Sequence, residues 1–126
     1  MALNKSEGKY AGEYLCSEAN GELSRDTVTL LTSATVYQPG DVLGIISATG
    51  KACLCVYTAT DGSDVARCIN YARQDASAGD IAGAPVTARD AEVNKAELNF
   101  GTSDATTISN MIADLAANRI FVRTGV

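Results

Sequence analysis

The 126-residue sequence contains no histidine, and this absence removes most of the familiar catalytic machinery. Serine and cysteine nucleophiles usually depend on a histidine base, and histidine is also the commonest general acid or base near neutral pH. An enzyme built from this sequence would have to work with cysteines or carboxylates alone. We therefore predict that the protein is not an enzyme and has no catalytic residues, cofactor or metal.

Large aromatic side chains are also scarce, because the chain has no tryptophan, two phenylalanines and five tyrosines. Hydrophobic residues nevertheless make up 46% of the sequence. A core of small and β-branched side chains favours short strands over a large helical bundle. The length is that of a single domain with a sizeable core.

Basic residues are outnumbered, with 10 Lys and Arg against 15 Asp and Glu, and they form no cluster. A net charge of −5 repels a phosphate backbone, so we expect no nucleic-acid partner. The sequence has no apolar run of about 18 residues and no signal-peptide pattern at its start, so we expect no membrane partner and synthesis in a cytoplasm.

Four cysteines stand at positions 16, 53, 55 and 68. In a cytoplasm they are expected to stay reduced and to act as small buried hydrophobes. Cys53 and Cys55 are separated by one residue, whereas zinc ribbons and redox pairs use two. An adventitious or interchain disulfide is the alternative.

Two further motifs are incomplete. Gly44, Gly50 and Lys51 resemble a phosphate loop, but the glycines are one residue too far apart and Ala52 stands where a hydroxyl is needed. The acidic residues around Gly62 lack the spacing of an EF-hand and are explained by turn chemistry.

Alternating apolar and polar residues predict a series of short strands, at 27–31, 35–37, 42–46, 52–57, 65–71 and 83–89. Turns are expected between them, among them Gln38-Pro39-Gly40-Asp41. Gly44 lies inside an apolar strand, which indicates a bulge or a close backbone contact.

Near the C-terminus the period changes to that of a helix. Apolar residues recur on one helical face at Ile108, Met111, Ile112, Leu115 and Ala116. Ser103 or Asp104 can cap its start and Asn118 can end it, and residues 120–123 then form a last strand. The predicted fold is α+β, mostly β: a compact body of short strands, one amphipathic helix near the C-terminus and an extended N-terminal arm.

The arm is the segment 13–26, preceded by residues 1–12, which are polar and expected to be disordered. Its first half can extend as a strand, and Asn20-Gly21 favours a turn. A segment with a few apolar anchors, here Tyr14 and Leu15, is suited to adding a strand to a partner's sheet. We predict a docking arm at 1–25 and a single body at 26–126.

The order and spacing of several short motifs are similar to those of the lambda-type head decoration proteins of tailed double-stranded DNA bacteriophages. The motifs are GEYL (12–15), SEANG (17–21), SRDTVTL (24–30), VLG (42–44), TDG (60–62), ARDAEV (88–93) and IFVR (120–123). The resemblance covers nearly the whole chain.

The resemblance implies a non-enzymatic protein of the virion that binds the outer face of the expanded head and cements the capsid against packaged DNA. Its implied partners are the major capsid protein and itself, as a homotrimer at three-fold and quasi-three-fold positions. It also implies that the arm orders on the capsid. The residues expected to bind the capsid are Tyr10, Glu13, Tyr14, Leu15, Ser17, Glu18, Asn20, Gly21 and Arg25.

The alternating charges of residues 88–93 predict local ion pairs on a solvated or interface surface, so Arg89, Asp90 and Glu92 are candidates for an inter-subunit surface. The alternative function is a virion module that binds host-surface glycans. That function would need exposed aromatic platforms, for which the five tyrosines are the candidates.

Overall fold

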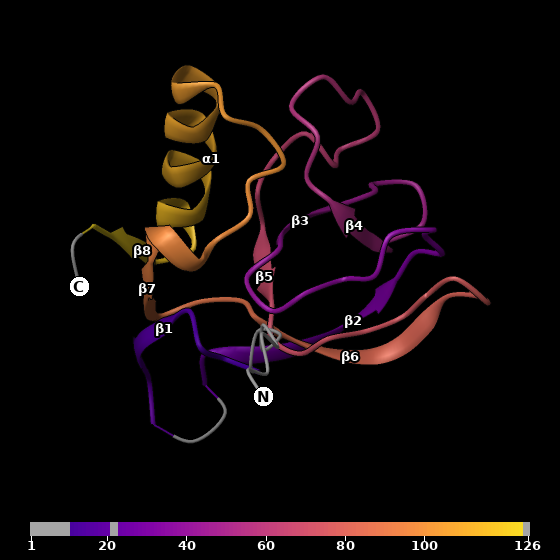
Figure 1. The fold of residues 1–126 in the computed structure, drawn as a ribbon, viewed down its shortest axis with the longest axis horizontal. Helices are drawn as coiled ribbons and strands as arrows, with labels where there is room; N and C mark the ends of the chain where they lie inside the picture. Colours follow the sequence, from indigo (N-terminus) through magenta and orange to yellow (C-terminus); the bar gives the residue numbers. More distant parts are fainter. Residues whose placement is uncertain (1–10, 21–22, 125–126) are drawn as a thin grey trace, which may run out of the picture.

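A computed structural model describes residues 11–20 and 23–124 and confirms many short strands with one helix near the C-terminus (Figure 1). The strands are β1 (Leu15–Glu18), β2 (Arg25–Leu30), β3 (Val42–Ile45), β4 (Ala52–Leu54), β5 (Cys68–Asn70), β6 (Ile81–Thr87), β7 (Ala91–Asn94) and β8 (Ile120–Arg123). A short 3-10 helix spans Lys95–Glu97, and helix α1 spans Ala105–Ala117.

Five strands form a closed barrel in the order β2-β4-β3-β5-β6. Its longest pairing joins β2 to β6 in antiparallel register from Arg25 opposite Thr87 onward. The interior is filled by medium-sized apolar side chains such as Leu30, Leu43 and Val86, all fully buried. The remaining buried residues of the barrel are mostly small, as the composition predicts, with Tyr37 as the one aromatic ring in the described cluster.

Gly44 lies in β3 opposite Cys53, at a point where another segment crosses the strand. A methyl group at Gly44 would lie 2.7 Å from Ser63 Cα and closer still to the Ser63 carbonyl oxygen. The predicted close backbone contact is thus confirmed, and it fixes the 55–67 loop against the barrel.

The second layer is the three-stranded sheet β1-β7-β8, which α1 covers on one face (Figure 1). Strands β7 and β8 are parallel, so Ala91 and Val93 lie beside Ile120 and Val122 and share the face toward the helix. Side chains alternate along a strand, so Glu92 and Phe121 occupy the opposite face. We call this opposite face the outer sheet face.

Helix α1 begins and ends where its caps were predicted. The Asp104 carboxylate accepts hydrogen bonds from Thr107 N (3.3 Å) and Thr107 Oγ1 (2.6 Å), and Asn118 is the C-cap. Met111 and Leu115 are buried against the sheet, as the periodicity predicts. These bonds also lower the pKa of Asp104, since they stabilise its ionised form.

Several predicted strands are shorter in the structure. Residues 35–37 contribute only a bridge between Tyr37 and Gln74, while the strands expected at 52–57 and 65–71 shrink to β4 and β5. The physical reason is that the 55–67 loop leaves the barrel to pack under α1. Ala66 is fully buried there, and its N–H donates to Asp114 Oδ2 at 3.3 Å.

All four cysteines are free. Cys55 and Cys68 are buried, which confirms their expected role as small hydrophobes, and burial raises the pKa of each thiol to about 12. Cys53 is half-buried and Cys16 is exposed.

Asp80 joins three parts of the barrel, and we expect it to make stability sensitive to acid. It accepts hydrogen bonds from Thr32 N (2.8 Å) and Thr32 Oγ1 (2.7 Å) and pairs with Lys51. The Lys51 and Thr32 contacts lower the pKa of Asp80 from 3.8 to about 2. The contribution of Asp80 to the free energy of unfolding is therefore complete above the pKa that Asp has in the unfolded chain. It is lost as the pH falls from 3.8 toward 2.

Urea unfolding of the wild type and of Asp80→Asn over that acid range checks this expectation. The free energy of unfolding should fall less steeply with decreasing pH in the variant, because its amide does not titrate. Parallel curves for the two proteins would contradict it.

Candidate functional site

The residues predicted to bind partners come together around β1 and β7. Tyr10 and Gly21 lie outside the described residues. In antiparallel pairing, Ser17 lies opposite Glu92 and Glu18 opposite Ala91. The predicted capsid-binding segment and the predicted inter-subunit surface are therefore neighbouring parts of one sheet.

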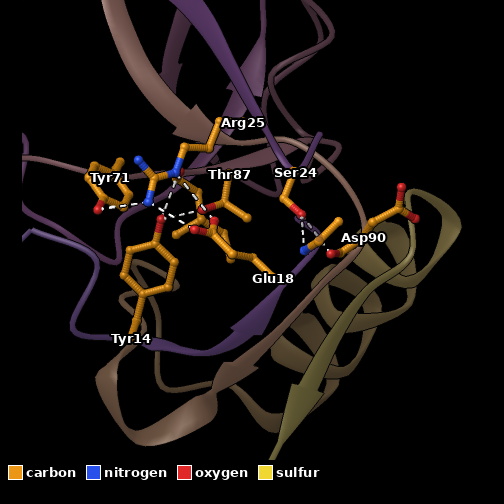
Figure 2. A network of polar contacts seen from close by, with 9 residues as sticks. Tyr14, Glu18, Ser24, Arg25, Tyr71, Thr87 and Asp90 are labelled. Carbon is orange, nitrogen blue, oxygen red and sulfur yellow. Dashed lines mark hydrogen bonds and ion pairs between the residues drawn. The ribbon is translucent and has the colours of Figure 1, made fainter. Parts of the chain in front are cut away.

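Tyr14 is a core residue in this structure. Its side chain is 0% exposed, and its hydroxyl lies 2.6 Å from Thr87 Oγ1 and 3.4 Å from the Ile69 carbonyl oxygen (Figure 2). Burial raises the pKa of its phenol. The sequence-based expectation of a partner-binding anchor differs from this arrangement, in which the ring is already buried where the barrel meets the sheet.

Strand β1 was expected to be completed by a partner, but in the described chain β7 completes it. Asn94 N donates to Tyr14 O at 2.8 Å, and Leu15 pairs with Val93. Residues 11 and 12, expected to be disordered, form a turn in which Gly12 N donates to Tyr71 O at 3.0 Å. The physical reason is that β7 offers a matching strand within the same chain.

Strand β1 remains an edge of its sheet among the described residues, since the strand order is β1-β7-β8. Its register shifts between Leu15 and Ser17, and Cys16 and Ser17 are exposed. A shift of this kind bends an edge strand and discourages uncontrolled pairing. The docking role of this segment stays a prediction.

Arg25 joins the end of β1 to the start of β2. Its guanidinium donates to Glu18 Oε1 (2.9 Å) and Glu18 Oε2 (3.3 Å) and to the Tyr71 hydroxyl (3.0 Å) (Figure 2). It also lies 4.1 Å from the centre of the Tyr71 ring. Glu18 raises the pKa of Arg25 through this hydrogen bonding. Glu18 and Arg25 thus pair with one another within the chain, and their role in binding a partner stays a prediction.

Ser24, next to Arg25, is fully buried and fastens the two layers together. Its hydroxyl accepts from Ala19 N (2.8 Å) and donates to the Asp90 carbonyl oxygen (2.7 Å) (Figure 2). Its own carbonyl accepts from Ala88 N at 2.8 Å. The sequence prediction did not include Ser24, because two of these partners, Ala88 and Asp90, are distant along the chain and leave no local signal.

The charged residues of 88–93 do not pair with one another as predicted. Each pairs with a different element: Arg89 with Asp26 (2.9 Å), Asp90 with Arg119, and Glu92 with Arg123 (3.1 Å). Arg89 and Asp90 lie in the turn before β7 and only Glu92 is in the strand, so each side chain meets a different part of the fold.

Asp90 and Arg119 hold the turns into β7 and β8. Both have positive φ, 53° and 58°, a conformation in which Asp is among the better tolerated residues. Their ion pair and the hydrogen bond from Ala91 N to Arg119 O (3.1 Å) tie the two turns together. Arg119 lowers the pKa of Asp90 by hydrogen bonding to its carboxylate.

A shallow groove of about 300 Å³ runs along one end of the outer sheet face. Phe121, 45% exposed, stands beside Glu92 in the parallel register and gives the groove an apolar patch. The residues that line the groove include Ser17, Glu18, Asp90, Glu92, Arg119 and Phe121. Paired charges around an exposed ring suit contact with another protein.

Other kinds of site find less support in the part of the chain that the structure covers. The described residues hold no group of three or more His, Cys, Asp or Glu side chains placed to bind a metal ion. No helix among them is long and apolar enough to cross a membrane.

An aromatic platform for glycans also gains no support from the four tyrosines that the structure describes, Tyr10 lying outside them. Tyr14 and Tyr37 are buried, Tyr71 lies beneath Arg25, and Tyr57, 52% exposed, stands on a separate loop.

A family model described as bacteriophage lambda head decoration protein D matches residues 4–120, and no curated relative matches the chain.

Proposed function

Because the chain belongs to the family of the bacteriophage lambda head decoration protein D, we propose that it binds the outer surface of the expanded phage head and stabilises the shell against packaged DNA. The resemblance seen in the sequence is confirmed by this membership. The family is one of structural capsid proteins, so the protein is a virion component and its family is not one of enzymes. The observation that carries the proposal is the match over residues 4–120.

The proposed partners are the major capsid protein and further copies of this chain, as a trimer at three-fold and quasi-three-fold positions. Three docking segments on one body bind far more tightly than one, because each raises the effective concentration of the others. A docking segment that orders only on binding would lose conformational entropy, and a single contact would then be weak and correctable during assembly.

The proposed capsid-binding region consists of the outer sheet face together with residues 1–10, which precede β1 in the sequence. Residues 1–10 lead through the Gly12 turn into the edge strand β1, so a capsid strand that pairs with this region would lie beside the exposed Cys16 and Ser17. Phe121 and the paired charges of the outer sheet face would then contact the same partner.

Deletion of residues 2–10 tests the docking role of the N-terminal segment. This deletion keeps Tyr14, β1 and Ser24, whereas removal of residues 1–24 would take a fully buried ring and a strand out of the domain. We expect the shortened protein to unfold at the same urea concentration as the full chain. Its affinity for expanded heads lacking a decoration protein should fall by about a hundredfold or more, measured by co-sedimentation.

A second variant, with residues 2–10 replaced by glycine and serine, separates side-chain contacts from chain length. It should bind as poorly as the deletion. Undiminished binding by either variant would assign docking to the folded domain alone, whereas failure of the full chain to bind heads would refute the decoration function itself.

A further inference from the structure

A cleft of about 230 Å³ opens on the barrel where its strands meet the end of α1. Its apolar floor includes Val28, Ile45 and Val86, which come from β2, β3 and β6. Two arginines stand among its polar lining. We call this site the arginine cleft, and its defining residues are Val28, Ile45, Val86, Arg67 and Arg89.

The two arginines differ in their partners, because only Arg89 forms an ion pair within the described residues. Arg89 donates to Asp26 Oδ2 (2.9 Å) and to the Leu23 carbonyl oxygen (2.8 Å). Arg67 is exposed, and its guanidinium has no ion pair or hydrogen bond with any residue that the structure describes. With Asp26 as the acidic residue of the lining, the cleft carries one excess positive charge, although the chain as a whole carries −5.

The charges of Arg67 and Asp26 both reach the thiol of Cys68, which also lines the cleft. Burial and then Asp26 raise the pKa of this thiol, whereas Arg67 lowers it. A guanidinium presents a planar fork of donors that matches a carboxylate in bidentate geometry. An anion beside an apolar group would therefore satisfy both halves of the site.

The lining of the cleft adjoins the proposed capsid-binding region along the chain. Arg89 belongs to its lining, and the next residue, Asp90, lines the groove on the outer sheet face. Leu23, 65% exposed, is joined to Arg89 and adds an apolar side chain at this end of the molecule. One partner protein lying across the outer sheet face would reach the cleft as well.

We propose that the arginine cleft binds an acidic segment of the shell protein, with a carboxylate on Arg67 and an adjoining aliphatic side chain on Val28 and Ile45. The inference rests on the proposed function, because it specifies what part of the partner the domain recognises. A nucleic-acid phosphate is disfavoured as the occupant by the net charge of −5.

Binding of full-length Arg67→Glu to expanded heads tests the proposal. Its affinity should fall by about tenfold or more, and that of Arg67→Gln by less, because the first variant adds a repulsive charge at the contact. The matched control is Arg73→Glu, since Arg73 is also exposed, forms no ion pair with the residues at 11–20 and 23–124, and lies outside the cleft. It changes the net charge equally and should bind within about twofold of the wild type.

Thermal unfolding checks that each variant is folded. The mass of the particle that each variant forms in solution without heads gives its oligomeric state. Equal binding by the Arg67 and Arg73 variants would overturn the proposal. A change in the mass of free Arg67→Glu would overturn it too, because the cleft would then join copies of this chain. Wild-type protein that fails to bind heads would refute the decoration function first, whereas a loss confined to the Arg67 variants supports the inference.

Discussion

Replacement of Tyr14 by alanine is expected to lower the free energy of unfolding by about 3–5 kcal/mol, the range for truncating a buried aromatic side chain. The ring is 0% exposed and belongs to the cluster that joins the barrel to α1 and the sheet. The substitution removes this packing and the hydrogen-bond partner of the buried Thr87 hydroxyl. Urea unfolding followed by circular dichroism at neutral pH measures the loss.

Tyr14→Phe is the control, because it keeps the ring and removes only the hydroxyl. It should cost about 1–2 kcal/mol, since Thr87 Oγ1 then loses the contact at 2.6 Å. If Tyr14→Ala were as stable as the wild type, the side chain would not be buried in solution. The segment would then be the free arm that the sequence predicts.

Gly44→Ala is expected to destabilise the barrel by about 3 kcal/mol, at the upper end for overpacking. The new methyl group would lie 2.7 Å from Ser63 Cα. Ser63 cannot move aside easily, because its carbonyl accepts from Val56 N (3.2 Å) and its hydroxyl donates to Asp61 Oδ1 (2.6 Å). The midpoint of urea unfolding reports the effect.

Gly79→Ala is the matched control for that substitution. A methyl group at Gly79 meets no atom within 4 Å, and its backbone is not in the left-handed region. Its stability should be unchanged or slightly raised, because alanine restricts the unfolded chain. A loss at Gly79 equal to that at Gly44 would show that steric contact with Ser63 is not the cause.

The features predicted correctly from the sequence depend on neighbours along the chain. Helix α1 has a clear period and its own cap at Asp104, and β8 spans residues 120–123 as predicted. Gly44 was identifiable because glycine weakens the interior of a strand, so its presence there indicates a bulge or a close backbone contact.

The features that were missed depend on pairing between distant residues. Leu15 pairs with Val93, and the partners of Asp90 and Glu92 are Arg119 and Arg123. An isolated β1 sequence looks the same whether its own domain or a partner supplies the adjacent strand. The ion pairs were likewise assigned to sequence neighbours because the sequence alone does not show which turns meet.

The contact between Tyr14 and Thr87 spans 73 positions, and this distance determines when the domain can close during synthesis. Strand β1 leaves the ribosome early, but β7, its partner, emerges only after the whole barrel sequence. Pairing of such distant segments requires closure of a long loop and is slow compared with local contacts. A nascent chain therefore cannot pair β1 with β7 until most of the protein has been synthesised. Incomplete chains consequently lack the complete outer sheet face.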